Sequence, residues 1–259
     1  MNSPLQAFLF DVDGTMADTE RDGHRVAFNR AFEEYGLEWH WSVETYGELL
    51  AVTGGKERMK FYTEKFLQPA QVPDSIDQLI PGLHQSKTRH YTELLSTGAI
   101  PLRPGVERLI NEARERGFRL AIVTTTTPEN VTALLTHTLG AESIDWFEVI
   151  AAGDIVPAKK PASDIYDFTL KAMKLNATQC IAFEDSSNGI KSSVGANLNT
   201  IVTINDYTKD DDFSAASIVL DHMGEPDQAF TVLSDNPPET TFLDCDLVEQ
   251  LHQQGQGKR

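Results

Sequence analysis

The chain has 259 residues and a hydrophobic content of 40%, enough to bury a sizeable core in one large domain or in a domain that carries an insert. Acidic residues (39) outnumber basic ones (22), and the formal charge of -17 argues against nucleic acid as a partner, because phosphate backbones are bound by clustered Lys and Arg. An anionic substrate would therefore need a locally positive site on this acidic protein.

The cysteine content indicates a reducing compartment. The two cysteines, Cys180 and Cys245, do not stand in any short Cys or His spacing typical of zinc sites. No apolar stretch approaches the length that spans a membrane, and the amino terminus lacks the basic start and apolar run of a signal peptide. We expect a cytoplasmic protein with no membrane partner. The sequence does not determine the oligomeric state, and we take a monomer as the expectation.

The first predicted strand, residues 8–10, leads directly into two carboxylates. Asp11 and Asp13 follow this apolar run and Gly14 allows the chain to turn. Alternate residues of a strand share a face, so the two carboxylates would point the same way if the strand continued. Two like charges held together call for a cation. The alternative is an ordinary strand followed by an acidic turn.

Between Asp18 and Ile100 the sequence predicts a block of helices and no strand. Apolar residues recur at helical spacing over three segments, the first of which has Gly36 at its expected end and the last of which contains Pro81. We expect Pro81 to kink or divide that last helix. The residues that mark the segments are Ala27, Phe28, Ala31, Phe32 and Tyr35; Met59, Tyr62 and Phe66; and Ile76, Leu79, Ile80, Leu83, Tyr91, Leu94 and Leu95.

From Pro101 onward strands and helices alternate. Pro104 and Gly105 open a predicted helix that ends at Gly117, and another helix is expected from near Pro128. Strand-like runs cover residues 119–123, 147–152, 180–183, 200–204 and 218–220. This alternation predicts an α/β protein with a doubly wound parallel sheet, covered on both faces. Such sheets bind ligands beyond the carboxyl ends of their strands.

The residues at those strand ends suit phosphoryl transfer. The carboxylates of Asp11, Asp13, Glu184 and Asp185 would hold a hard cation, for which magnesium fits best. Thr124 adds a hydroxyl before a helix start that can bind phosphate, and Lys160 adds a mobile cation. One carboxylate can attack phosphorus and the other can move protons.

Each of these elements also has an ordinary structural explanation. Residues 124–127 can be a helix-capping run, residues 159 and 160 a solvated lysine pair, and residues 184 and 185 a turn. Their joint occurrence at successive strand ends favours a site.

In these four places the sequence resembles the haloacid-dehalogenase-like phosphatase superfamily. Residues 11–15 look like its first motif, Thr124 its second, Lys160 its third and residues 184–185 its fourth, and the likeness covers roughly residues 5–225. The resemblance implies a Rossmann-like core, magnesium and a helical cap inserted after the first motif. It also implies roles: Asp11 as nucleophile, Asp13 as general acid and base, Thr124 and Lys160 as phosphate ligands, with Glu184 and Asp185 at the metal end.

A lid of this kind can choose the substrate. The candidate substrate contacts are Glu20, His24, Gly55, Lys56, Arg58 and Lys87 in the helical block, and Arg103, Thr125 and Thr126 in the core. Taken singly, each more often makes a surface contact or a salt bridge, and His24 can equally be a packed or capping histidine. The cations would form a small positive pocket in a negative protein.

Within the superfamily the sequence looks like the CbbY type, close to the β-phosphoglucomutase branch. This likeness rests on residues 23–25, Trp39, Trp41 and residues 54–58, 87–88, 102–105 and 124–130. It implies a phosphatase of a sugar bisphosphate, xylulose 1,5-bisphosphate, that removes an inhibitor of Rubisco and so serves carbon fixation. A second substrate phosphate would explain the cationic cap. The alternatives are a sugar phosphomutase and a non-enzymatic phospho-accepting or sugar-phosphate-binding regulator.

We therefore expect three regions. Residues 1–18 and 101–230 form the catalytic core, residues 19–100 the cap, and residues 231–259 a C-terminal extension that contains the acidic, proline-bearing segment 234–238. Asn197 stands where the family usually has glycine, and asparagine tolerates the left-handed backbone expected there. Leu247 and Leu251 indicate a short final helix. Packing against the core and self-association are both open for this extension.

Overall fold

The computed structural model describes residues 4–235 and 237–256, so Asn236 and both chain ends lie outside the described residues. A single parallel sheet organises the core, with strand order β3-β2-β1-β4-β5-β6. The strands are β1 (Ala7–Phe10), β2 (Arg119–Val123), β3 (Phe147–Ala151), β4 (Cys180–Glu184), β5 (Asn199–Thr203) and β6 (Ile218–Leu220). The order reverses at β1, as in a doubly wound fold, and the predicted α/β class is confirmed.

Both faces of the sheet are buried, which explains why the strands are almost entirely apolar. Phe8 and Phe10 of β1 face the helices α5 (Val106–Glu115) and α6 (Pro128–Leu139), while Ala7 and Leu9 face α7 (Asp164–Met173). Helix α8 (Ser187–Gly195) packs on β5 through Ile190. Short 3-10 turns span Pro69–Gln71, Ala141–Trp146 and Ala177–Gln179. The core thus presents the carboxyl ends of β1, β2 and β4 side by side.

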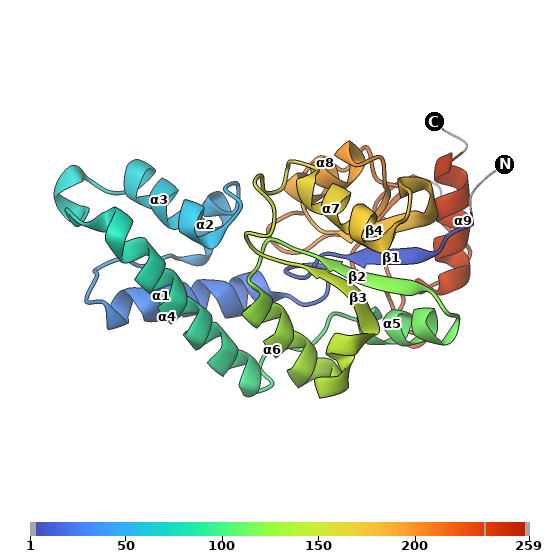
Figure 1. The fold of residues 1–259 in the computed structure, drawn as a ribbon, viewed down its shortest axis with the longest axis horizontal. Helices are drawn as coiled ribbons and strands as arrows, with labels where there is room; N and C mark the ends of the chain where they lie inside the picture. Colours follow the sequence, from blue (N-terminus) through green and yellow to red (C-terminus); the bar gives the residue numbers. More distant parts are fainter. Residues whose placement is uncertain (1–3, 236, 257–259) are drawn as a thin grey trace.

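The segment between β1 and α5 is helical in the structure. It begins with one π-helical turn, η1 (Glu20–His24), and continues as α1 (Arg25–Glu34), α2 (Val43–Leu49), α3 (Gly55–Lys65) and α4 (Ile76–Ser96). These helices extend away from one end of the sheet (Figure 1). They share an aromatic cluster of their own, made of Phe28, Phe32, Trp39, Trp41, Tyr46 and Tyr62. We call the helical region from η1 to α4 the cap.

Two features of the cap differ from the sequence prediction. The pattern did not reveal η1 or α2, because both are too short to show a helical period. Of the two outcomes expected at Pro81, a kink or a division, the division does not occur, since α4 runs unbroken from Ile76 to Ser96. Pro81 lies near the start of α4, where the missing N–H removes a single helical hydrogen bond. Among the described helices, none is long and apolar enough to cross a membrane.

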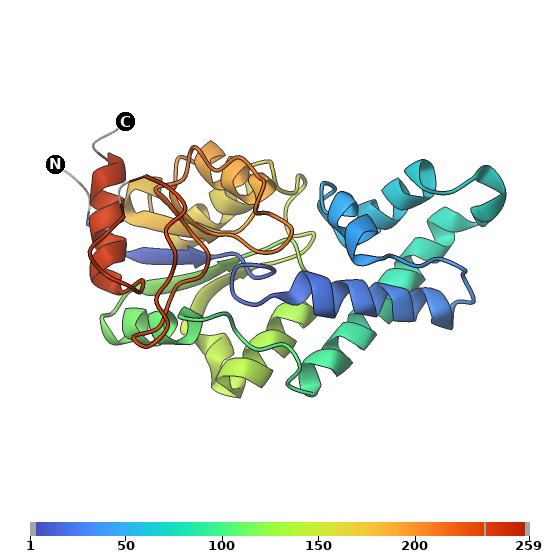
Figure 2. The ribbon, with the colours of Figure 1, turned by 180° about the vertical axis from the view of Figure 1, so that it is seen from behind.

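The end of the chain belongs to the core. Residues around Val232 run along the edge strand β6, where the Leu233 amide donates to the Val219 carbonyl. Helix α9 (Cys245–Gln256) then places Leu247, Val248 and Leu251 in the main apolar cluster. Figure 2 shows this segment crossing the back of the core to reach α9. The predicted final helix is confirmed, and its apolar side packs against the core. The predicted left-handed backbone at Asn197 is also present, with φ 61°.

Candidate active site

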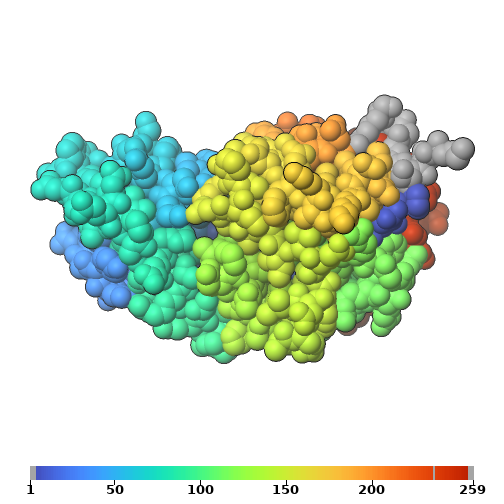
Figure 3. All heavy atoms as spheres, in the orientation of Figure 1, coloured from blue at the N-terminus to red at the C-terminus, as the bar shows by residue number. Residues whose placement is uncertain are grey.

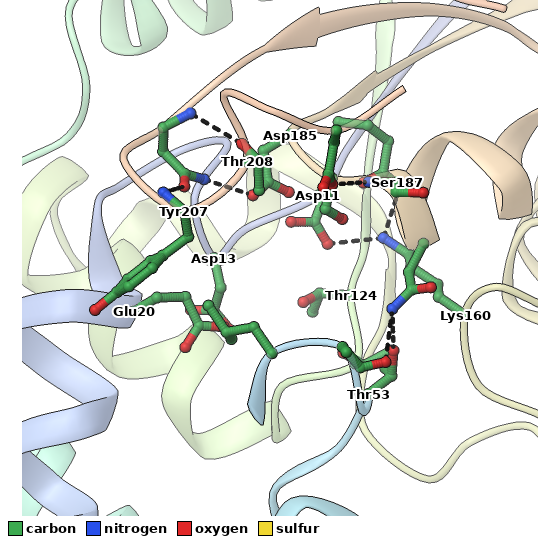
Figure 4. A pocket seen from close by; sticks show the side chains of 18 of the residues that line it. Asp11, Asp13, Glu20, Thr53, Thr124, Lys160, Asp185, Ser187, Tyr207 and Thr208 are labelled. Carbon is green, nitrogen blue, oxygen red and sulfur yellow. Dashed lines mark hydrogen bonds and ion pairs between the residues drawn. The ribbon is translucent and has the colours of Figure 1, made fainter. Parts of the chain in front are cut away.

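A cleft of about 400 Å³ lies between the cap and the carboxyl ends of β1, β2 and β4. Figure 4 shows side chains from both regions pointing into it. The core contributes most of the predicted catalytic residues and the cap contributes its inner face. The residues of the first group are Asp11, Asp13, Thr124, Lys160, Glu184 and Asp185, and those of the second include Glu20, Thr53 and Arg58.

Three buried carboxylates meet at the centre of the core rim. Asp11, Glu184 and Asp185 each place an oxygen within 4.8 Å of the other two. Lys160 joins them, with its Nζ atom 2.7 Å from Asp11 Oδ1, 2.7 Å from Glu184 Oε1 and 2.9 Å from the Val123 carbonyl. Three carboxylates and one ammonium leave a formal charge of −2. The structure thus brings the predicted first, third and fourth motifs into direct contact.

The protonation of this cluster depends on its burial. Desolvation raises the pKa of Asp11 from 3.8 to about 8, against the lowering effect of Lys160. Burial also raises the pKa of Asp185 well above its usual value, and the neighbouring carboxylates Asp11 and Glu184 add to that shift. Lys160 has its pKa raised, because attraction to Asp11 and Glu184 outweighs its desolvation. The raised pKa values mean that holding these carboxylates together in ionised form is unfavourable, a cost that a bound cation would relieve.

The oxygen atoms of the cluster suit a divalent metal ion. Glu184 Oε1 accepts hydrogen bonds from Lys160 and from the Tyr166 hydroxyl, whereas the buried Glu184 Oε2 has no partner among the described residues. Asp185 Oδ2 accepts from the Asn205 side-chain amide at 2.7 Å. An all-carboxylate donor set with an unpartnered buried oxygen fits Mg²⁺, which prefers oxygen ligands.

Asp13 lies apart from this carboxylate cluster. Its Oδ1 accepts from the Thr19 hydroxyl at 2.5 Å and lies 2.8 Å from His24 Nε2. Lys87 Nζ lies 2.8 Å from His24 Nδ1, and an ammonium can only donate, so His24 Nε2 carries the proton that reaches Asp13. Burial alone would raise the pKa of Asp13, but His24 and Thr19 hold it below its usual range. The side chain of Asp13, which we expected among the metal ligands, borders the cleft and is bound by Thr19 and by His24 of the cap.

The threonines after β2 divide between the cleft and the helix start. Thr124 is buried, borders the cleft and accepts from the Thr126 amide at 3.3 Å. Thr125 also borders the cleft, and Thr126 borders a narrow recess beside it that includes Gly55 and Lys87. The Asn130 side chain donates to the Thr126 hydroxyl at 2.8 Å. Thr124 and Thr125 are therefore the members of this run that face the main cleft.

On the cap side, the buried Arg58 and the partly exposed Glu20 form a charged pair through Tyr46. Arg58 Nη1 donates to the Tyr46 hydroxyl at 2.7 Å and lies 3.7 Å from Glu20 Oε2, to which Tyr46 donates. The guanidinium also lies over the Tyr46 ring, 5.1 Å from its centroid. These contacts hold the Arg58 charge at the wall that faces the core.

Two predicted substrate contacts lie elsewhere. Arg103 is buried, and its guanidinium is occupied by Asp18 and by the carbonyls of Gly14, Thr203, Ile204 and Asp221. These partners all belong to the core, and Arg103 does not border the cleft. Lys56 is on the outer side, where its Nζ lies 2.6 Å from Asp154 of the core. The charged groups of both residues are thus bound by carboxylate or carbonyl oxygens outside the cleft and do not face a substrate there.

Four residues of the site were not foreseen. Thr19, Tyr46, Tyr166 and Asn205 position Asp13, Arg58, Glu184 and Asp185 respectively. Tyr46 lies on α2, which was not predicted. Tyr166 occupies an apolar position of α7, so the sequence pattern does not distinguish it from the other core residues of that helix. Of the four, only Thr19 lies close in sequence to the residue that it positions, since it follows Asp13 by six residues.

The family model of haloacid dehalogenase-like hydrolases matches residues 5–197, and the chain belongs to this family of hydrolases. Its likeness is to CbbY proteins. It is 45% identical to plasmid-encoded CbbY of Cupriavidus necator over 223 residues, 86% of this chain and 87% of that protein. CbbY of Rhodobacter sphaeroides, solved as a mutant in complex with xylulose 1,5-bisphosphate, is 42% identical with a TM-score of 0.78, covering 84% of this chain and 94% of that one.

β-Phosphoglucomutase of Clostridium difficile shares the fold, with a TM-score of 0.71 at 20% identity, over 96% of this chain and 98% of that one. The resemblance found in the sequence is therefore confirmed. The protein is a phosphatase of the CbbY type within the haloacid dehalogenase-like hydrolases.

Proposed function

We propose that this phosphatase is magnesium-dependent and hydrolyses a sugar bisphosphate, xylulose 1,5-bisphosphate, through an aspartyl phosphate on Asp11. The observation that carries the proposal is that the two sides of the cleft differ in charge and face each other. The carboxylates and Lys160 line the core wall, and the buried cations Arg58 and Lys87 border the cap side. A substrate with two separated phosphates suits both walls, and CbbY of Rhodobacter sphaeroides has been solved with such a compound.

In the first half-reaction, an Asp11 oxygen attacks phosphorus and the bond from phosphorus to the sugar oxygen breaks. Asp13 protonates that leaving oxygen. Lys160 and Thr124 bind the oxygens of the transferring phosphoryl group. A magnesium ion bound by Asp11, Glu184 and Asp185 would supply positive charge that neutralises the phosphate.

In the second half-reaction, Asp13 takes a proton from water, which attacks the aspartyl phosphate and releases inorganic phosphate with Asp11 regenerated. The contacts with His24 and Thr19 keep Asp13 ionised, the form that this step requires. The first half-reaction needs Asp13 in its protonated form, so its contacts with His24 and Thr19 must rearrange before that step. Asp13 therefore links the chemistry to the position of the cap.

The proposed cap, residues 19–100, would act as a lid over the core formed by residues 1–18 and 101–230. Its role would be to exclude water and to hold the second phosphate with Arg58 and Lys87. Glu20 would accept hydrogen bonds from sugar hydroxyls, since it shares the cleft with both walls. Gly55 would line the recess beside the cleft, and a Cβ atom there would lie 2.9 Å from the His84 ring, so the glycine lets the start of α3 pack closely within the cap.

The test is a panel of sugar phosphates supplied with magnesium, with free phosphate and remaining sugar phosphate both measured. We expect xylulose 1,5-bisphosphate to give phosphate with the highest kcat/KM, and a chelator to stop the release. Formation of an isomerised phosphosugar without free phosphate would replace the phosphatase proposal by a mutase. A stable phosphoprotein without turnover would instead indicate a phospho-accepting regulator.

A further inference from the structure

Four charged side chains join the cap to the core outside the cleft. Lys56 and Glu57 lie at the start of α3, and Asp154 and Lys159 lie in the core loop between β3 and α7. Lys159 Nζ lies 3.0 Å from both Glu57 carboxylate oxygens and 2.9 Å from Asp154 Oδ1. Lys56 Nζ lies 2.6 Å from Asp154 Oδ2. We call these four residues the ion-pair cluster, and two of its pairs cross from cap to core.

The backbone of the cap accommodates this cluster at Gly54. Its φ of 98° is a conformation that favours glycine. A Cβ atom there would lie 2.2 Å from Glu57 Oε2 and 2.7 Å from Lys159 Nζ, so a side chain at this position would displace the ion pair. The glycine therefore permits both the turn into α3 and the contact with the core loop.

The same stretch of the cap touches the core a second time. The Asn188 side chain, at the start of α8, donates to the Thr53 hydroxyl at 3.1 Å. Figure 4 shows Thr53 at the border of the cleft opposite the core residues. In Figure 3 the light-blue atoms of the cap meet the yellow-green atoms of the core beside a hollow. Residues 53–57 thus form one of the contacts between the cap and the core beside the cleft.

The core loop that receives these contacts also carries Lys160. Lys159 and Lys160 are consecutive but their side chains diverge, one toward Glu57 of the cap and the other toward Asp11 and Glu184. Residues 152–163 contain no helix or strand, so the loop is fixed mainly by what its side chains hold. A cap residue and a catalytic residue therefore act on adjacent positions of one irregular segment.

We propose that the ion-pair cluster positions Lys160: when the cap closes, Glu57 and Lys56 fix the loop that holds Lys160 against Asp11. The part of this inference that concerns turnover rests on the proposed function, because it assumes that Lys160 takes part in the reaction. The part that concerns closure of the cap by the ion-pair cluster does not depend on that function. A lone exposed ion pair contributes little, but Lys159 is only 17% exposed and has two carboxylate partners. The cluster should also weaken as salt screens its charges.

A double-mutant cycle on Glu57→Gln and Lys159→Gln tests the proposal, with p-nitrophenyl phosphate and magnesium as the probe. We expect each single variant to lower kcat about fivefold or more, with Lys159→Gln the stronger because it also removes the contact with Asp154. The double variant should be no worse than Lys159→Gln alone, since both single changes break the contact between Glu57 and Lys159. The wild-type kcat should fall as NaCl rises, and the variants should lose most of that dependence. The matched control is Lys60→Gln with Asp77→Asn, an exposed pair 3.4 Å apart within the cap, whose removal should leave kcat unchanged.

A second readout follows the cap without any substrate. Spin labels on Lys65→Cys in the cap and Lys171→Cys in the core, both exposed positions, report the distance between the two regions, and the native Cys180 and Cys245 are buried. We expect the Glu57→Gln and Lys159→Gln variants to populate longer distances than the wild type. Unchanged distances, or strictly multiplicative losses of kcat, would overturn the proposal. If the wild type hydrolyses nothing while the distances respond, the proposed function fails and closure of the cap by the cluster stands.

Discussion

The two walls of the cleft hold their charges by different means. On the core wall the main chain places Asp11, Thr124 and Glu184, because they directly end or follow neighbouring parallel strands. Side chains there, Tyr166 and Asn205, only orient carboxylates that the strand ends have already placed. On the cap wall the positioning is done by side chains, as Tyr46 holds Arg58 and His24 holds Lys87. Changes on the core wall should therefore affect the chemical step, and changes on the cap wall should affect substrate binding.

The largest effect should come from the nucleophile. Asp11→Asn removes the attacking carboxylate while keeping its size, and we expect kcat to fall by at least about 10⁴-fold. Phosphate release from xylulose 1,5-bisphosphate with magnesium measures it. Asp22→Asn, which changes an exposed acid of η1, is the control and should leave kcat within about twofold, as is usual for surface changes. Turnover by Asp11→Asn at the wild-type rate would remove Asp11 from its proposed role.

The second largest effect should come from a change in α8 that displaces a member of the carboxylate cluster. A Cβ atom at Gly189 would lie 1.8 Å from Glu184 Oε2, so Gly189→Ala must displace this carboxylate. We expect a loss of about 10²-fold in kcat/KM and a higher magnesium requirement, as for other changes that move metal ligands. A magnesium titration of the rate is the measurement.

Gly195→Ala is the matched control on the same helix. Its Cβ atom would lie 3.3 Å from the Ser163 side chain, a contact that a small shift relieves. We expect kcat/KM within about threefold of the wild type, because helix interiors favour alanine over glycine. Equal losses in the two variants would mean that α8 itself, rather than Glu184, is disturbed.

The two walls also differ in how far the sequence foretold them. The core wall was predictable because strands are short apolar runs and parallel strands end at a common rim, which placed Asp11, Thr124 and Glu184 together. The cap wall was only partly predictable: Glu20, Arg58 and Lys87 were named, yet Tyr46, the partner of Glu20 and Arg58, lies on a seven-residue helix with no visible period. Arg103 was assigned to the substrate for its charge and for its place where the chain re-enters the core. Its contacts with four carbonyl groups from distant segments depend on tertiary structure that no local pattern carries.

The pH dependence of stability provides a test confined to the cap. Burial lowers the pKa of His84, on α4, from 6.5 to about 4, and the nearby Lys87, Lys56 and Lys159 add to the shift. Between those pH values the unfolded chain binds more protons than the folded one, so His84 stabilises the fold above pH 6.5 and this contribution is lost as the pH falls toward 4.

Replacing this side chain should remove its share of the acid sensitivity. When the pH is lowered from neutral to about 4, the free energy of unfolding should fall in both proteins. We expect the fall to be about 2 kcal/mol smaller for His84→Asn than for the wild type. Urea unfolding at the two pH values gives the two free energies. If the wild type and the variant lose the same free energy on acidification, His84 is not the group responsible.

The smallest effect should come from one hydroxyl group of the cap wall. Tyr46→Phe keeps the ring under Arg58 but removes the oxygen that accepts from Arg58 Nη1 and donates to Glu20. Because Arg58 is proposed to hold the second phosphate, we expect KM for the bisphosphate to rise about tenfold with little change in kcat, the pattern of lost uniform binding. Tyr62→Phe is the control, since within the described residues the Tyr62 hydroxyl has no hydrogen-bond partner, although its ring belongs to the same aromatic cluster. A fall in kcat with KM unchanged would show instead that the cap wall takes part in the chemical step, and the division of labour between the walls would not hold.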